Sequence, residues 1–420
     1  MPMSQAFKDR LFPIAVDLAS HYGTPFHIYD ERGIRETGER LNQAFSKIEG
    51  FREYFAVKAL PNPKILALMK ELGFGFDCSS IPELILSRQA GGRGEDIMFT
   101  SNNTTREEFD RAAADGGCIL NLDDISLIAK VPDFPEQVCF RYNPGPRRTG
   151  NIIIGNPVEA KYGVTHEQLI PAYKMAQQRG AKRFGIHTMV ASNERDYTYI
   201  VETARMLLQL AEEIAAELGI RFEFLNIGGG LGIPYKPEDA ALDLDAMAAE
   251  IAGLFANFQA RQGYAPRMYM ESGRWITGPH GVLVTRAINH KEIYRQYIGV
   301  DACMSALMRP GMYEAYHHID VIGKQDQTRS QVYDVVGSLC ENNDKFAIQR
   351  QLPPIDEGDL LAIQDTGAHG HAMGFQYNGR LRPKELLLRT DGSVELIRRA
   401  ETNADYFQTL NFTPDLFPAP

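Results

Sequence analysis

The feature that most constrains the fold is the alternation of short apolar runs with helical segments over the first 275 residues. Runs rich in β-branched and aromatic side chains, bounded by Gly, Pro or charged residues, are typical of buried strands. Strands that alternate with helices pair in parallel, and eight of them close a barrel. The sequence therefore predicts an α/β fold built on a (β/α)8 barrel of the TIM type. The eight expected strands are Tyr54–Val57, Phe74–Asp77, Ile97–Thr100, Cys118–Leu122, Gln137–Tyr142, Phe184–His187, Phe222–Ile227 and Met268–Glu271.

One segment between these strands has the periodicity of a helix on the barrel wall. Over Thr203–Leu218, apolar side chains recur at three- and four-residue spacing, for example at Leu207, Leu210 and Ile214. Gly219 follows, and glycine is a typical helix stop. The stripe predicts a face packed on the core.

The pattern changes after Trp275, where short β-rich runs broken by Gly, Pro and Asn replace helical periodicity. We predict a second, all-β domain there. The early run Thr24–Tyr29 precedes the first barrel helix and is expected to pair into the later sheet. The expected domains are residues 32–275 for the barrel, and 1–31 with 276–420 for the β-rich domain. The tail at 412–420 is expected to pack loosely.

Composition excludes several classes of partner. Fifty-four acidic side chains against 44 basic ones give a formal charge of −10 without a local basic patch, so neither nucleic acid nor an anionic membrane surface is expected to bind. No run approaches the roughly 18 consecutive apolar residues of a membrane span, and the N-terminus lacks a secretory signal. Five cysteines, an odd number with no CxxC pair, favour a reducing cytoplasm.

Polar side chains stand at the carboxyl ends of several expected strands, on the rim where barrels of this type build active sites. The Lys58 amine is suited to a Schiff base if its pKa is lowered, although most lysines are plain surface charges. Glu271 is suited to holding a heterocyclic nitrogen in its protonated form, and Arg274 to pairing with an anion; a surface ion pair is the alternative. The rim residues are Lys58, Asp77, Arg141, His187, Asn226 and Glu271.

A glycine-rich loop, NIGGGLGIPY, follows the seventh strand. Gly228, Gly229 and Gly230 leave backbone N–H groups that can approach a phosphate closely because no Cβ intervenes. The spacing does not match G-x-G-x-x-G, which argues against a dinucleotide site. A phosphate cradle and a simple tight turn both remain open.

Together these segments resemble the family of diaminopimelate and ornithine decarboxylases, which use pyridoxal phosphate on an alanine-racemase-like barrel. The resemblance covers nearly the whole chain. DACMSALMRPGMYEAYHH and VVGSLCENNDKFA, with Glu341 after Cys340, are most similar to the diaminopimelate decarboxylases. The matching motifs, in family order, are Y-F-A-V-K-A, G-F-D-C-S-S, R-Y-N-P, K-Y-G, G-G-G-L-G, E-S-G-R, R-P-G-M-Y-E-A-Y, C-E-N-N-D and G-A-H…Y-N-G-R-L-R-P.

The resemblance implies a cofactor, pyridoxal phosphate, and residues that bind it. Lys58 is implied to hold it covalently, and Glu271 to keep its pyridine nitrogen protonated so that the ring is an electron sink. Asp77 matches a position near the cofactor, with a structural role as the alternative. The phosphate is implied to sit on Gly228, Gly229, Gly230, Ser192, Gly273 and Arg274.

The resemblance also implies a small amino-acid substrate and a homodimer with shared active sites. Arg309 and Tyr313 match the family's substrate-binding pair, and Arg274 is also implied to meet a substrate carboxylate. Cys340 as proton donor and Glu341 as the partner of a distal ammonium group are implied to reach into the partner subunit's site. No metal is expected, because the histidines near the C-terminal motifs lack a ligand set.

Three residues depart from the family pattern. Met189 stands where the family usually has a histidine stacked on the cofactor ring; a thioether can lie against an aromatic face, and His187 is the alternative group. His369 stands where a tyrosine usually contacts phosphate and substrate. Ser272 replaces the common proline of E-P-G-R and is expected to loosen a turn without removing a contact.

The function that these observations favour is decarboxylation of meso-2,6-diaminopimelate to L-lysine and CO2, in lysine biosynthesis. Two alternatives stay open. One is a decarboxylase of another basic or carrier-linked amino acid, since Met189 and His369 change the cofactor's surroundings. The other is a non-catalytic regulatory homologue, against which the presence of Lys58 and Glu271 argues.

Overall fold

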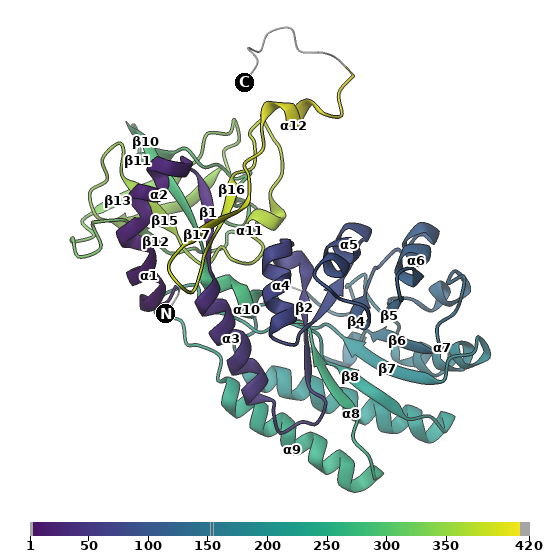
Figure 1. Ribbon diagram of the computed structural model, residues 1–420. Helices are drawn as coiled ribbons and strands as arrows, with labels where there is room; N and C mark the ends of the chain where they lie inside the picture. The colour runs from purple at the N-terminus through teal and green to yellow at the C-terminus, as the bar shows by residue number, and fades with distance from the viewer. Residues whose placement is uncertain (1–2, 152, 154, 412–420) are drawn as a thin grey trace. The chain divides into compact units, whose positions relative to one another are not determined.

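The computed structural model describes residues 3–151, 153 and 155–411, and its central feature is a closed barrel of eight parallel strands (Figure 1). The strands follow one another in chain order, and the last pairs with the first through Arg52↔Tyr269 and Glu53↔Met270. The predicted fold class is thereby confirmed. The strands are β2 (Arg52–Ala56), β3 (Gly75–Cys78), β4 (Gly94–Phe99), β5 (Cys118–Leu122), β6 (Gln137–Tyr142), β7 (Arg183–Thr188), β8 (Phe222–Asn226) and β9 (Arg267–Met270).

A cluster of buried side chains fills the barrel. It draws one residue from each of six strands, an arrangement that requires all six side chains to point to the barrel axis. The rings of Tyr54 and Tyr269 contact each other within it, with centroids 4.9 Å apart and planes tilted by 50°. Because side chains alternate along a strand, the neighbours of these residues point outward to the helices. The cluster is Tyr54, Met98, Ile119, Cys139, Phe224 and Tyr269.

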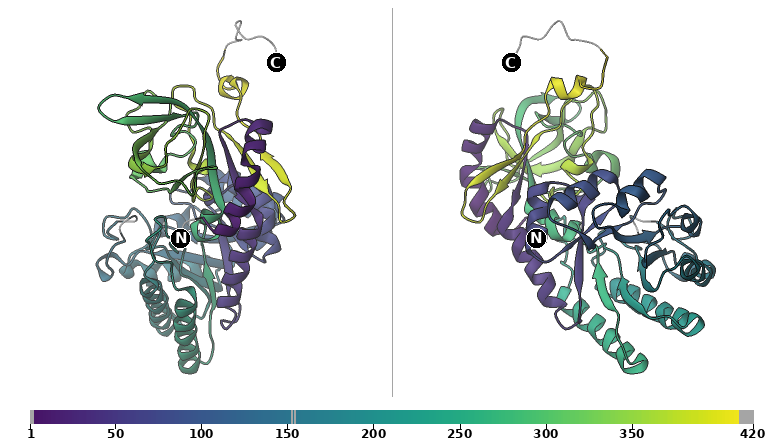
Figure 2. Two further views of the ribbon diagram at one scale, coloured as in Figure 1. Left: turned by 90° about the vertical axis from the view of Figure 1, so that its left-hand side faces the viewer. Right: turned by 45° about the vertical axis from the view of Figure 1, so that its right-hand side comes forward.

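The longest helix of the barrel wall shows how the sequence sets the ends of an element. It begins after Asp196, whose carboxylate accepts a hydrogen bond from the Thr198 N–H at 3.0 Å, and it ends at Gly219, which has a φ of 66°. This helix, α8 (Tyr197–Leu218), lies beside α9 (Leu244–Gln262) (Figure 2). The other helices in this part of the chain are α3 (Glu31–Ala44), α4 (Pro63–Glu71), α5 (Ile81–Gln89), α6 (Arg106–Ala113), α7 (His166–Gln178) and α10 (Arg274–Thr277).

A second, mixed sheet of nine strands is built from both ends of the chain. Its main path runs β14-β13-β11-β10-β1-β16-β17. Off this path, β15 pairs with β10, and β12 pairs with β15. The early strand β1 (Phe26–Asp30) lies between β10 and β16, which confirms the expected pairing of the early run. The later strands are β10 (Gly281–Glu292), β11 (Gln296–Val300), β12 (Ile319–Val321), β13 (Gln331–Val336), β14 (Lys345–Leu352), β15 (Leu360–Ile363), β16 (Lys384–Leu388) and β17 (Val394–Arg398).

By packing, the described chain forms two units. The barrel unit consists of Asp30–Gly281, Asp365–Ala372 and residues 3–8, and the sheet unit contains the remainder. The short helices outside the barrel wall are α1 (Gln5–Leu11), α2 (Ala15–Tyr22), α11 (Arg309–Tyr313) and α12 (Asn403–Phe407). The domain limits expected from the sequence stay a prediction, and the tail at 412–420 lies outside the described residues. None of the described helices is long and apolar enough to cross a bilayer.

Candidate active site

A hollow opens at the carboxyl ends of the barrel strands, and every residue that lines it belongs to the barrel unit. Parallel pairing brings these strand ends to one rim, so side chains far apart in sequence meet there. Nine of the residues expected to bind cofactor or substrate line it: Lys58, Asp77, Met189, Ser192, Gly230, Glu271, Gly273, Arg274 and His369. Ala56, Asn193, Leu231 and Ser272 complete the lining.

Lys58 presents its amine at this rim from a single 3-10 turn, Val57–Ala59, directly after β2. Val57 and Ala59 are buried, whereas Lys58 is exposed. Its amine forms neither a hydrogen bond nor an ion pair with any described residue. The His369 N–H donates to the Ala59 carbonyl at 2.9 Å, and this bond holds the backbone at His369 beside the turn. A lysine amine without a partner, held by buried neighbours, is suited to covalent chemistry.

Glu271 is the best-anchored charge of the rim. Its Oε1 accepts a hydrogen bond from Asn226 Nδ2 at 2.7 Å, and its Oε2 lies 3.1 Å from His187 Nε2. Burial acts to raise the pKa of Glu271, but His187, Lys58 and Asn226 together hold this pKa below its usual value. The carboxylate therefore stays ionised. His187 is buried on Glu271 and does not line the hollow.

Asp77, at the end of β3, behaves in the opposite way. Burial raises its pKa well above the usual value, and the Glu271 charge raises this pKa further, against a smaller effect of Lys58. Its Oδ1 has no hydrogen-bond partner among the described residues. The two carboxyl groups of the rim thus have pKa values shifted in opposite directions, an arrangement typical of active sites. Arg141, also expected on the rim, pairs with Asp123 at 3.5 Å and lies outside the hollow.

The glycine loop packs so closely on the rim that side chains are excluded from it. A Cβ on Gly229 would stand 2.1 Å from the Glu271 carbonyl oxygen, and one on Gly230 2.6 Å from the Ala191 carbonyl oxygen. The Gly229 N–H donates to Met189 Sδ at 3.2 Å. Ser192, on the neighbouring segment, donates its N–H to Asn151 Oδ1 at 3.2 Å. Met189 therefore lies against the loop and lines the hollow, and its position beside a cofactor ring stays a prediction.

Arg274 begins α10 and is fixed by a contact that sequence reasoning missed. Its Nη1 donates to the Tyr235 hydroxyl oxygen at 2.5 Å, and its guanidinium carbon lies 5.8 Å from the centroid of that ring. Tyr235 ends the motif NIGGGLGIPY, so the loop and the arginine are linked. The signal was present in the sequence only as an aromatic residue after the glycines.

The other four expected site residues belong to the sheet unit, and their roles stay predictions. Arg309 begins α11, is buried, and has its Nε 3.5 Å from His317 Nε2, whereas Tyr313 at the end of α11 is exposed. Cys340 is exposed and donates its N–H to Asn378 Oδ1 at 2.7 Å. Glu341 accepts a hydrogen bond from the Asn343 N–H.

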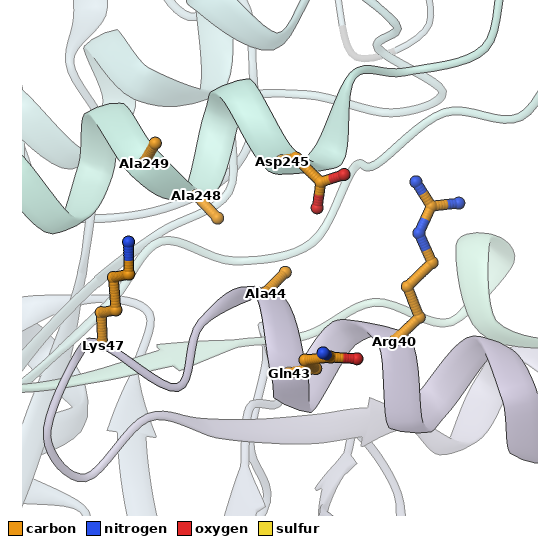
Figure 3. Close-up of a pocket in the computed structure, with 7 residues that line it drawn as sticks. All are labelled: Arg40, Gln43, Ala44, Lys47, Asp245, Ala248 and Ala249. Carbon is orange, nitrogen blue, oxygen red and sulfur yellow. The ribbon is translucent and has the colours of Figure 1, made fainter.

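A second hollow, between α3 and α9, offers no comparable chemistry (Figure 3). Arg40 lies across from Asp245, and Lys47 points toward Ala248 and Ala249 of α9. The charges are of both signs, and the lining has one carboxyl group, that of Asp245, rather than a pair. Among the described residues, no group of three or more His, Cys, Asp and Glu side chains is placed to hold a metal ion.

Comparison with known proteins places this geometry in a family. The model of the pyridoxal-binding domain of pyridoxal-dependent decarboxylases matches residues 32–278. The chain is 48% identical over 418 residues to Protein TabA of Pseudomonas amygdali pv. tabaci, covering 99% of this chain and 98% of that protein. It is 38% identical over 404 residues to the diaminopimelate decarboxylase of Methanothermobacter thermautotrophicus, covering 94% of each. The solved diaminopimelate decarboxylase of M. jannaschii in complex with L-lysine has a TM-score of 0.87 at 30% identity, covering 95% of this chain and 94% of that one.

The chain therefore belongs to the pyridoxal-dependent decarboxylases, and pyridoxal phosphate is its cofactor. The donor set at the rim fits this group. Lys58 offers an amine without a partner, Glu271 an ionised carboxylate, and Arg274 a cation for a phosphate. Gly230 of the glycine loop lines the hollow beside them.

Proposed function

We propose that this protein decarboxylates meso-2,6-diaminopimelate to L-lysine and CO2, as a step of lysine biosynthesis. The observation that carries the reaction class is the pairing of an unpartnered Lys58 amine with an ionised, doubly anchored Glu271 in one hollow. Similarity to diaminopimelate decarboxylases over nearly the full chain, and Glu341 after Cys340, support the substrate.

In this proposal each rim residue has a defined task. When bound, pyridoxal phosphate supplies an electron sink for the pair of electrons released with CO2. Lys58 binds its aldehyde carbon, and Glu271 holds a proton on the ring nitrogen. Gly230 and Arg274 bind its phosphate, while the Met189 thioether covers the ring. Burial and the Glu271 charge favour the protonated form of Asp77, and this form does not compete for the ring's proton.

The substrate is assigned to groups of the sheet unit. Arg309 forms a two-pronged ion pair with the carboxylate that is retained, and Tyr313 binds beside it. Glu341 of a second subunit binds the distal ammonium group, and the Cys340 thiol next to it donates the proton to Cα. This arrangement requires a homodimer with shared sites. Because all five cysteines are free thiols, we assign the protein to the cytoplasm.

A second substrate class has specific support. The relative at 48% identity carries a name that states no substrate, and two rim residues differ from the family's usual pattern. His369 lines the hollow with a φ of 57°, and Met189 lies on the glycine loop. Both alter the surroundings of the cofactor and substrate. A basic or carrier-linked amino acid is therefore the alternative substrate of the same chemistry.

Product formation decides between these substrates. Purified holoenzyme is incubated in parallel with meso-diaminopimelate, lysine, ornithine and arginine, and CO2 and the amine product are measured. We expect lysine and CO2 in equal amounts from diaminopimelate, at a kcat/KM at least tenfold above the others, which is about 1.4 kcal/mol of discrimination. Lys58→Ala is the control and should form neither product. A preference for another amino acid would replace diaminopimelate with that substrate.

A further inference from the structure

Glu53 is a buried carboxyl group with no task in the chemistry above. It lies on β2, five residues before Lys58, and is fully buried. Its Oε1 accepts a hydrogen bond from the backbone N–H of Ser272, while its Oε2 has no hydrogen-bond partner among the described residues. An acid is costly to bury, and a hydrophobic residue would fill a strand position at lower cost. Its one hydrogen bond, from the Ser272 N–H, links this costly buried acid to the rim of the active site.

The bond reaches the rim from the outer side of the barrel. Tyr54 points to the barrel axis, so the preceding residue, Glu53, points away from it. Glu53 stands opposite Met270 in the β2–β9 register, and Ser272 lies two residues further along the chain. The hydrogen bond consequently joins the strand that leads to Lys58 to the turn that carries Glu271 and Arg274. Ser272 therefore adds a contact at this turn that the common proline could not make, because proline has no N–H.

The same turn packs directly on the residues that flank Lys58. A Cβ on Gly273 would stand 2.5 Å from the Ala59 Cβ and 3.3 Å from the Ala56 Cβ. A side chain at Gly273 would not fit there, so the turn lies directly on the residues that flank Lys58. This packing and the bond to Glu53 together hold the turn that carries Glu271 beside the backbone that carries Lys58.

We propose that Glu53 is a positioning residue, which fixes the Glu271–Arg274 turn relative to Lys58 through the Ser272 amide and so keeps the cofactor site in its binding geometry. The inference rests on the cofactor-binding roles assigned to Lys58 and Glu271 and is independent of which amino acid is the substrate. Glu53 acts through the backbone and touches neither cofactor nor substrate.

The charge state of Glu53 supports this role. Burial raises the pKa of Glu53 well above its usual value and outweighs the Ser272 amide, which lowers it; the charges of Glu271 and Asp77 raise it further. Burial thus favours the neutral form of Glu53, which accepts a hydrogen bond without adding a negative charge behind the rim. A glutamine at this position retains the accepting oxygen and is also neutral.

Four variants separate the bond from the residues that form it. Glu53→Met removes the acceptor at similar volume, and Glu53→Gln keeps it. Ser272→Pro removes the donor, and Ser272→Ala keeps it. For each holoenzyme we measure the dissociation constant of pyridoxal phosphate, the pH midpoint of the visible absorbance of the Lys58-bound cofactor, and the Tm of the cofactor-free protein.

Loss of one buried hydrogen bond should weaken cofactor binding by about fivefold. We expect this loss, with a shifted pH midpoint, for Glu53→Met and Ser272→Pro, and values within about twofold of the parent for Glu53→Gln and Ser272→Ala. The double variant Glu53→Met/Ser272→Pro should lose about fivefold rather than the product of the two, because both changes remove the same bond.

Two results would overturn the positioning role. One is a lower Tm in Glu53→Met with an unchanged dissociation constant and pH midpoint, which indicates a purely structural acid. The other is an equal defect in Glu53→Gln and Glu53→Met, which would show that the accepting oxygen, retained by glutamine, does not carry the effect. The Glu53 pair decides the question even if Ser272→Pro does not fold. Lys58→Ala must abolish the visible band; if it does not, the assigned cofactor site fails, and not the role of Glu53.

Discussion

His280 is predicted to make the stability of the barrel unit depend on pH. It ends a 3-10 turn, Gly278–His280, that follows α10, and its ring is buried against α3. Its Nε2 lies 2.7 Å from Thr37 Oγ1, and its Nδ1 has no partner among the described residues. A Cβ on Gly33 of α3 would stand 2.3 Å from that Nδ1, so no water fits between them. Burial alone lowers the pKa of His280 from 6.5 to about 4.

The size and sign of the effect follow from this pKa. Between about pH 6.5 and about pH 4 the unfolded chain binds a proton at this histidine that the folded chain does not. The free energy of unfolding therefore falls as the pH is lowered through this window. A shift from 6.5 to about 4 corresponds to about 3 kcal/mol in total, of which about 2 kcal/mol is lost between pH 7 and pH 5.

Urea unfolding of the parent and of His280→Gln at pH 7 and pH 5 measures this loss. Glutamine can reach Thr37 with its amide but does not titrate. The single tryptophan, Trp275, lies in α10 of the barrel unit, so its fluorescence reports on that unit. The exposed His21 on α2 gives the matched control, His21→Gln.

We expect the parent and the His21→Gln variant to lose about 2 kcal/mol more than His280→Gln between the two pH values. Other titrating groups contribute equally to all three proteins and cancel in the difference. An equal loss in the parent and in His280→Gln would show that the buried imidazole does not resist protonation. Titration of the His280 ring by NMR near pH 6 or above would lead to the same conclusion.

Three further predictions concern the rim and the substrate. Glu271→Gln should retain bound cofactor but lower kcat by roughly 100-fold, because a neutral amide does not hold a proton on the ring nitrogen; a kcat within threefold of the parent would contradict this role. Gly229→Ala should weaken cofactor binding, because the new Cβ meets the Glu271 carbonyl at 2.1 Å, whereas Gly253→Ala, with open space around its Cβ, should leave binding unchanged. Arg309→Lys should raise the KM for diaminopimelate by at least tenfold, since lysine does not form a two-pronged ion pair; an unchanged KM would remove Arg309 from the substrate site.

The eight barrel strands were predictable because each is a buried parallel strand, which reads as a continuous apolar run. The predicted bounds differ from the observed ones at the ends of the strands and helices. β4 begins at Gly94 and not at Ile97, because its first residues are polar and only half buried. Helix α8 begins six residues before the predicted Thr203, because the cap at Asp196 lies outside the periodic stripe. Local patterns describe what an element buries, whereas its ends depend on single hydrogen bonds.

The residues of the candidate site were predictable where they belong to a recognisable motif. They were less predictable where their role depends on a contact between distant parts of the chain. Lys58, Glu271 and Arg274 lie together at the rim as expected. Glu53 reads in the sequence as a charge at the start of a strand, and its burial depends on Ser272, more than 200 residues later. Tyr235 was equally hidden, because its contact with Arg274 exists only once the barrel has closed.

The place of β1 in the middle of the second sheet has a consequence for synthesis of the chain. β1 pairs on one side with β10 and on the other with β16, whose residues leave the ribosome more than 350 positions later. Both edges of this apolar strand lack partners until β10 is made, and one edge still lacks its partner until β16 is made, while the intervening residues can already close the barrel. Each added residue in so long a loop adds little to the free-energy cost of closing it, but the large sequence separation delays the pairing of β1 with β16. A nascent chain of this protein thus carries an unpaired strand for most of its translation and needs protection from aggregation during that time.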